Sequence, residues 1–183
     1  SQFRVFKEIV GGGGTVRGFV VPTSTPGFVA NPIKHKLSLR ASATSELVLT
    51  DVRLPADSVL PGVASLRGPL SCLSEARFGI VFGAVGAARD CLETAISYSQ
   101  NRRQFDRPIA GFQLTQAKLA QMTSTVATAF LLAMRLGSLK DAGGLAPEQV
   151  SLGKFTNVSS ALEVARTART ILGGNGISGE YPI

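Results

Sequence analysis

The sequence predicts a mainly α-helical protein in which a partial β-domain precedes an antiparallel helical bundle. Three long stretches after residue 63 carry apolar residues at three- and four-residue steps, which is the period of a helix. Between residues 15 and 62, apolar and polar residues alternate between prolines and glycines, as in short strands. The joins between the helical stretches are short, and helices joined in this way pack antiparallel.

Residues 1–14 differ in composition from the sequence that follows. Apolar residues at positions 3, 5, 6, 9 and 10 favour a short strand, and Gly11–Gly14 has the composition of a flexible linker. Two interpretations stay open: a native strand and glycine loop, or a non-native peptide joined through a glycine linker. We draw no functional inference from this segment.

Residues 15–62 are expected to form strands. The segments VRGFVVP, GFVANPI and KLSLRASATSELVLTDVRLP alternate in polarity, and the strongest strand is expected over Leu47–Leu49 with Val52 and Leu54. Three or four strands make a thin sheet when they stand alone. A linker from Pro55 to Arg67, rich in proline, glycine, alanine and serine, separates this part from the helices.

The first helix is expected between Pro69 and Phe112. Its apolar positions are Phe78, Phe82, Val85, Ala88, Cys91, Ala95 and Tyr98. Small residues such as Gly83 and Gly86 would let a neighbouring helix approach closely. The basic cluster Asn101–Phe105 is expected in the last turn, where cations suit the negative end of the helix dipole. By itself, this cluster is more simply a solvated helix end than a ligand site.

The second helix is expected over residues 112–142, and Gly143-Gly144 ends it. Its apolar face comprises Leu114, Leu119, Met122, Val126, Phe130, Ala133 and Leu136. The third helix begins at Pro147-Glu148, because proline suits the first turn and a carboxylate suits the positive end. Its expected core face is Val150, Phe155, Val158, Leu162 and Ala165, and the run Gly173–Gly176 stops it.

The composition narrows the classes of ligand. A formal net charge of +7 suits phosphate-rich molecules, whereas basic runs interleaved with aromatic residues, which nucleic-acid binding favours, are absent. A single histidine and two cysteines without a CxxC pair predict no metal site. We find no signal peptide and no spanning apolar run, so we expect a soluble protein without membrane insertion, with reduced Cys72 and Cys91.

Several motifs occur together in the helical part. The blocks ARFGI, GAVGAA and RRQFDRPIAGFQ resemble the C-terminal helical domain of the acyl-CoA dehydrogenases, which are flavoenzymes that oxidise acyl-CoA thioesters. SLRGPLSCLSEARFGI at 65–80 and LGGNGISGEY at 172–181 resemble glutaryl-CoA dehydrogenases more narrowly. The resemblance covers about residues 16–183. It implies that residues 15–62 are part of a middle β-domain and that residues 63–183 are an incomplete C-terminal helical domain.

The resemblance implies FAD as the cofactor. Arg102 occupies the position of the RxxF arginine that contacts FAD, and a guanidinium can bridge two phosphate oxygens. The other FAD-contacting positions that match are Phe105, Gln113, Gly173 and Gly174, with Gly176 completing the GGxG run. Without the resemblance, Gln113 would be a polar residue at a helix start and the glycines would be a helix stop.

The resemblance also assigns the acyl-CoA channel to the segment that opens the first helix. The matching positions are Leu70, Ser71, Cys72, Leu73, Ser74 and Arg77, of which Arg77 is the strongest candidate. Ser74-Glu75 stands where the glutaryl type has paired asparagines, which puts the transfer of its substrate preference in doubt.

No acidic residue of the chain matches the catalytic base of the family. The base is expected in a Y-E-G-T block beyond Ile183, so we expect the isolated chain not to oxidise glutaryl-CoA. The resemblance further implies a cytoplasmic or mitochondrial-matrix homotetramer that passes electrons to an electron-transfer flavoprotein. In the glutaryl type the product is decarboxylated to crotonyl-CoA. The alternative from another class is a non-catalytic helical association module.

Overall fold

The computed structural model describes residues 2–9 and 15–183, with side chains from residue 17 onward. The chain forms two compact units, Ser1–Ser71 and Cys72–Ile183. The Gly11–Gly14 linker lies outside the described residues. The expected boundaries of the β-part and the helical part, at 15, 62 and 63, stay predictions.

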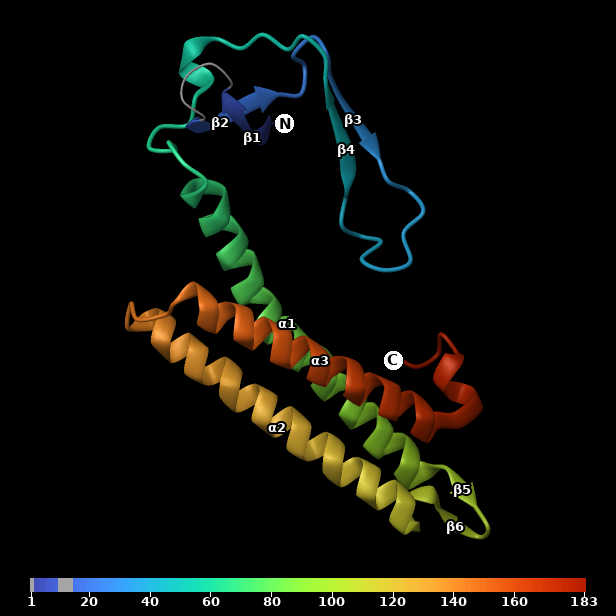
Figure 1. Ribbon diagram of the computed structural model, residues 1–183. Coiled ribbons are helices and arrows are strands. Elements are labelled where there is room, and N and C mark those ends of the chain that lie inside the picture. The colour runs from blue at the N-terminus through green and yellow to red at the C-terminus, as the bar shows by residue number, and fades with distance from the viewer. Residues whose placement is uncertain (1, 10–14) are drawn as a thin grey trace. The chain divides into compact units, whose positions relative to one another are not determined.

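β2, β3 and β4 lie in segments where the alternating pattern predicts strands, but the KLSLRAS part of the prediction is wrong, because residues 33–44 form the loop between β3 and β4. β1 (Gln2–Ile9) pairs antiparallel with β2 (Thr15–Pro22), so that Gln2 lies opposite Pro22 (Figure 1). β3 (Phe28–Pro32) pairs antiparallel with β4 (Ser45–Leu49), and the short 3-10 helix η1 covers Ala56–Ser58.

The strongest expected strand is shorter than its pattern. β4 ends at Leu49, so the inclusion of Val52 and Leu54 is wrong. Asp51 has φ +50°, a left-handed conformation that breaks an extended strand. Gly27, with φ +81°, lies so close to the Thr50 carbonyl that a Cβ there would be 2.0 Å from the oxygen. This close approach requires glycine just before β3, where the Thr50 N–H donates to the Gly27 carbonyl at 2.9 Å and extends the pairing of β3 with β4.

Three long helices form the second unit, and the mainly α-helical prediction is confirmed. α1 covers Arg67–Asn101 and begins in the first unit, α2 covers Gln113–Asp141, and α3 covers Pro147–Leu172 (Figure 1). Gly143, with φ +70°, ends α2 as expected, and Gly173 ends α3. The side-chain oxygen of Gln149 accepts a hydrogen bond from the Ala146 N–H at 2.9 Å and so caps the start of α3.

The basic cluster does not belong to the last turn of the first helix, which corrects the expectation. α1 ends at Asn101, and a hairpin follows: β5 (Arg103–Gln104) pairs with β6 (Arg107–Pro108). The 3-10 helix η2 (Ile109–Gly111) then leads into α2. The two hairpin-loop residues, Phe105 and Asp106, have positive φ, which a continuing helix does not allow.

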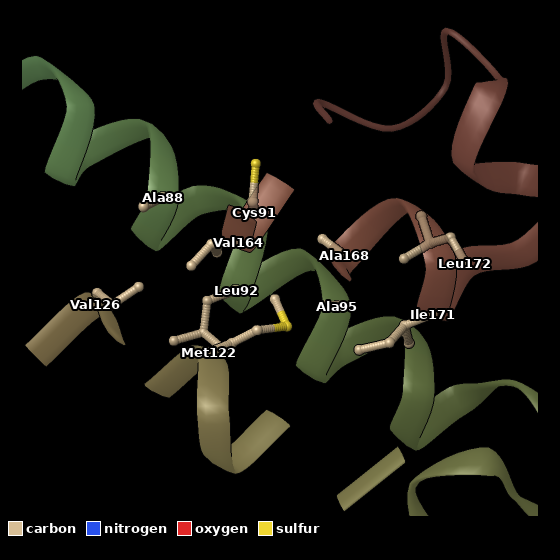
Figure 2. Close-up of a cluster of buried hydrophobic side chains, with 10 residues drawn as sticks. All are labelled: Ala88, Cys91, Leu92, Ala95, Met122, Val126, Val164, Ala168, Ile171 and Leu172. Carbon is tan, nitrogen blue, oxygen red and sulfur yellow. The ribbon is translucent and has the colours of Figure 1, made fainter. Parts of the chain in front are cut away.

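Two clusters of buried side chains form the core of the bundle. Figure 2 shows the larger one, in which α1, α2 and α3 all contribute; its buried members are Ala88, Cys91, Leu92, Ala95, Met122, Val126, Val164, Ala168, Ile171 and Leu172. The smaller one consists of Val81, Val85, Ala129, Ala133 and Leu136. The apolar periods of α1 and α2 therefore identify most of their buried faces.

The expected core face of the third helix is largely wrong. Phe155, Val158 and Leu162 are 72%, 41% and 49% exposed. The buried face instead contains small and polar residues that a hydrophobic pattern overlooks, such as Gly153 and Asn157. On α2, Leu114 and Phe130 are also exposed, at 81% and 52%. These side chains form apolar surface on the outside of the unit.

Asn157 joins the three helices through its buried side chain. Its Nδ2 donates to the Val81 carbonyl of α1 at 3.2 Å and to the Ala129 carbonyl of α2 at 3.0 Å. Gly153 lies one turn earlier on the same face. A Cβ there would be 2.2 Å from Leu136 Cδ1 and 3.4 Å from Val81 Cγ2. The absence of a side chain at Gly153 therefore allows α3 to approach closely enough for Asn157 to reach both carbonyls.

Gly83 and Gly86 do not receive a neighbouring helix within the chain, contrary to the expectation. A Cβ at either position would meet no described heavy atom within 4 Å. Both cysteines are free; Cys72 is exposed and Cys91 is buried. Burial, and secondarily the neighbouring Asp90 carboxylate, raises the pKa of the Cys91 thiol, so it stays protonated at neutral pH.

α1 and α2 each contain an 18-residue window long and apolar enough to cross a membrane, with a mean hydropathy of 1.3. The sequence-based search for a spanning run did not detect these windows. Only 11% of the α1 window and 28% of the α2 window are buried, so most of this apolar surface lies outside the core of the described chain. In the structure the two helices pack with α3, and Figure 2 shows this shared apolar core.

We expect Gly153→Ala to lower the free energy of unfolding relative to Gly83→Ala. Both replacements gain about 1 kcal/mol of helix propensity, but only the first forces a methyl group into the packed core, at about 1–3 kcal/mol. Chemical denaturation of both variants measures the difference directly, because the propensity gain cancels. Equal stabilities would contradict the close approach of α3.

Candidate functional site

A pocket of about 370 Å³ is lined by residues from the C-terminal end of α1, the hairpin β5–β6 and the C-terminal end of α3. Figure 1 shows these elements at one end of the bundle. Arg102, Gly173 and Gly174, three of the residues predicted to bind FAD, line the pocket together. The remaining lining residues are Tyr98, Gln104, Ile109, Ile171, Leu172 and Asn175. The fold thus brings together two motifs that are about 70 residues apart in the chain.

The backbone holds Arg102 on both sides. Its N–H donates to the Tyr98 carbonyl at 2.8 Å, and its own carbonyl accepts from the Ile109 N–H at 2.8 Å. Arg102 therefore leaves the helix at a defined point. Its side chain is exposed and makes no hydrogen bond or ion pair with the side chains described from residue 17 onward. A fixed guanidinium without a partner is available to an anion from solution.

The hairpin presents Phe105 away from the pocket. Phe105 and Asp106, with φ +52° and +62°, form the two-residue loop, and Arg103 donates to the Asp106 carbonyl at 2.6 Å. The Phe105 ring is 87% exposed and meets Phe112 edge-on at 6.3 Å between centroids. The positive φ of a bulky aromatic residue is uncommon outside such turns. Phe105 lies beside the pocket and does not line it.

The glycines of the run 173–176 have two different structural roles. Gly173 has φ +60°, and a Cβ at Gly173 or Gly174 would meet no described atom within 4 Å, so the pocket is open at these positions. Gly176 is buried, and a Cβ there would be 2.3 Å from the Arg169 carbonyl oxygen. Gly176 is therefore required by the close packing of the 3-10 helix η3 (Gly173–Ile177).

Sequence reasoning did not assign three polar residues of the pocket: Tyr98, Gln104 and Asn175. Asn175 Nδ2 donates to the Tyr98 hydroxyl at 3.0 Å, and the Tyr98 ring meets Tyr181 edge-on at 5.6 Å. Tyr98 stood in the apolar period of the first helix, and Asn175 stood inside the glycine run. The four-residue spacing of Tyr98 and Arg102 at the end of the expected first helix was the signal available in the sequence.

Gln113 does not line the pocket. It is the first residue of α2 and is exposed. The neighbouring Gln116 donates to the Ala110 carbonyl at 3.0 Å and so supports the loop before α2. The FAD assignments of Gln113 and Phe105 stay predictions, as do those of the three residues that the pocket brings together.

The predicted acyl-CoA segment lies in the first turns of α1. Leu70 and Ser71 lie in the first unit, and the other four positions lie in the second. Within the helix, Leu73, Ser74 and Arg77 share one face, whereas Cys72 falls on the opposite side. One helical face therefore cannot present all of the predicted residues to one ligand.

Glu75, which stands where the glutaryl type has an asparagine, pairs with Lys140. Both of its carboxylate oxygens accept from Lys140 Nζ at 2.7 Å, and Lys140 lies 4.7 Å from the Phe78 ring centroid. Ser74, Glu75, Phe78 and Lys140 line a pocket of about 160 Å³ between α1 and the α2–α3 turn. Glu75 thus ties the start of α1 to the bundle.

The charge around the Arg102 pocket is positive. Arg102, Arg103 and Arg107 lie within six residues of one another, and Asp106 is the one carboxylate among them. Among the described residues, no group of three metal-ligating side chains occurs. The pocket combines a free guanidinium, open glycine backbone and apolar walls, and this combination fits a phosphate-bearing molecule with an aromatic or aliphatic part.

The helical part of the chain matches one known protein family. The family described as "Acyl-CoA dehydrogenase, C-terminal domain" matches residues 67–183. The human mitochondrial short-chain specific acyl-CoA dehydrogenase is 34% identical over 169 residues, which cover 91% of this chain and 41% of that protein.

Two solved structures of glutaryl-CoA dehydrogenase from Mycobacterium smegmatis are similar over almost the whole chain. One has 66% sequence identity and a TM-score of 0.94, covering 99% of this chain and 46% of that one. The other, in complex with FADH2, has 58% identity and a TM-score of 0.94 with the same coverage. The chain thus spans less than half the length of the relatives it matches.

Proposed function

The chain belongs to the acyl-CoA dehydrogenase family, and on this premise we propose that it forms the C-terminal part of an FAD-dependent acyl-CoA dehydrogenase of the glutaryl-CoA type. The observation that carries the proposal is the Arg102 pocket, in which the RxxF arginine and the GGxG run lie together. The 66% identity to a glutaryl-CoA dehydrogenase supports the substrate class.

The residues of the pocket fit the diphosphate of FAD. Among the side chains described from residue 17 onward, none pairs with the Arg102 guanidinium, so it can pair with two phosphate oxygens; Gly173 and Gly174 leave their backbone open to a ligand. When bound, FAD supplies the hydride acceptor for oxidation of the Cα–Cβ bond of a thioester. The chain's own task is to bind and orient, because Arg102 is fixed at the end of α1 by its two backbone hydrogen bonds.

We expect Arg102→Ala to weaken binding of FAD by about 10- to 100-fold, because a charge-assisted hydrogen bond contributes about 1.5–3 kcal/mol. Arg102→Lys retains the positive charge but not the paired N–H donors of the guanidinium, so we expect it to lose less affinity for FAD than Arg102→Ala. The measurement is a fluorescence titration of the protein with FAD. Arg89→Ala is the matched control; it removes the same charge from α1, where Arg89 pairs with Glu93 at 2.9 Å. Equal affinities of the Arg102→Ala and Arg89→Ala variants would refute the assignment.

A protein that carries this chain is expected to oxidise glutaryl-CoA in preference to butyryl-CoA and to release crotonyl-CoA and carbon dioxide. Reduction of an artificial acceptor dye with each thioester measures the preference, and mass spectrometry of the product detects decarboxylation. Electron-transfer flavoprotein is the proposed natural acceptor. Preferential oxidation of butyryl-CoA without release of carbon dioxide would agree with the family assignment but would contradict the proposed glutaryl-CoA specificity.

Self-association is the third part of the proposal, with a homotetramer as the assembly. It is supported by the apolar surface of α3, where Leu152, Phe155, Val158 and Leu162 are exposed to between 41% and 72%. Such a continuous apolar stripe marks an interface. A non-catalytic association module would share this surface but would not need the Arg102 pocket, so binding of FAD separates the two functions.

We expect sedimentation velocity to show a species heavier than one chain and Phe155→Gln to shift it toward the monomer. Lys154→Gln is the matched control, since it places the same side chain one position away on another side of the helix. A monomeric parent protein would contradict the proposed assembly, and an unchanged mass in Phe155→Gln would exclude this face of α3.

A further inference from the structure

We propose that Tyr98 is a further ligand-binding residue of the Arg102 pocket: its hydroxyl donates a hydrogen bond to a phosphate oxygen of the dinucleotide, and Asn175 is the positioning residue that orients this hydroxyl. The inference rests on the function proposed above for the pocket.

The hydrogen-bonding capacity of the phenol is only half used. A tyrosine hydroxyl has one proton to donate and lone pairs that accept. Asn175 Nδ2 donates to the oxygen at 3.0 Å, so one acceptor position is occupied. No group among the side chains and carbonyls described from residue 17 onward accepts the Tyr98 proton. The proton is therefore available to a ligand.

The side chains of Tyr98 and Arg102 line the same pocket. They are one helical turn apart, the Tyr98 carbonyl accepts the Arg102 N–H at 2.8 Å, and both side chains line the pocket. A neutral O–H donor beside an unpaired guanidinium suits an acceptor that carries several negative oxygens, such as a diphosphate. Carbonyl or amide ligands would not use the positive charge.

Two neighbours hold the phenol in place. The Tyr181 ring packs edge-on against Tyr98 at an interplanar angle of 90°. Asn175 lies between Gly174 and Gly176, so its amide fixes the glycine run relative to α1. Because Asn175 occupies the acceptor side of the hydroxyl, it restricts the direction in which the proton can point.

The test compares Tyr98→Phe with Tyr181→Phe in the full chain, titrated with FAD and with ADP, which retains the diphosphate without the flavin. Each variant loses one hydroxyl and retains its ring, but only Tyr98 lines the Arg102 pocket. We expect Tyr98→Phe to weaken both ligands by about 10- to 100-fold, the effect of a hydrogen bond to a charged group. Tyr181→Phe should bind as the parent does.

Asn175→Ala tests the positioning role. We expect a weaker loss of affinity than in Tyr98→Phe, and no additional loss when Asn175→Ala is combined with Tyr98→Phe, because the amide acts through the hydroxyl. An independent loss in the double variant would assign Asn175 a purely structural role. Thermal unfolding of each variant shows that the titrations are made on folded protein.

The outcomes separate the inference from the function on which it rests. If Arg102→Ala weakens FAD binding and Tyr98→Phe does not, the role of Tyr98 is refuted and the proposed function stands. If Tyr98→Phe weakens FAD but not ADP, the hydroxyl does not bind the phosphates. If the parent chain does not bind FAD, or binds it independently of Arg102, both proposals fail together.

Discussion

The buried amide of Asn157 is the interaction on which the helical unit depends. It donates to one carbonyl of α1 and one of α2, so a single side chain connects three helices. Its Oδ1 has no partner among the described residues, and a buried amide loses stability unless its groups are paired. Gly153, one turn earlier on α3, contributes to this close packing, because a Cβ there would be 2.2 Å from Leu136 Cδ1. Apolar side chains fill the remaining space, as Figure 2 shows for the larger cluster.

This packing places the Arg102 pocket. Once α1 and α3 are held side by side, the end of α1 at Asn101 and the end of α3 at Leu172 lie at the same end of the bundle (Figure 1). The hairpin loop at Phe105 and Asp106 then returns the chain toward α2. Arg102 leaves the helix at that point, and among the described side chains its guanidinium has no hydrogen-bond or ion-pair partner; a Cβ at the neighbouring Gly173 or Gly174 would meet no described atom within 4 Å. Both helices present their negative dipole ends here, so in the proposed phosphate site the positive charge comes from the Arg102 guanidinium.

Both units expose apolar side chains. In the first unit, Val21 and Phe28 are the buried hydrophobic side chains among those described, which is little core for two separate two-stranded sheets. In the second unit, the outer face of α3 exposes Phe155 and Leu162. Exposed apolar faces of this kind mark association surfaces. The proposed homotetramer accounts for the face of α3.

The sequence by itself determined the helical class, the helix starts and stops at Gly143, Pro147 and Gly173, and the family, because periodicity, breakers and motifs are local properties of the chain. It did not determine which face of α3 is buried, since Asn157 and Gly153 look unsuitable for a core until two other helices surround them. Nor did it reveal that Arg102 follows the end of α1 or that Tyr98 and Asn175 meet. Those facts depend on contacts between residues distant in sequence, and only the tertiary structure brings these residues together.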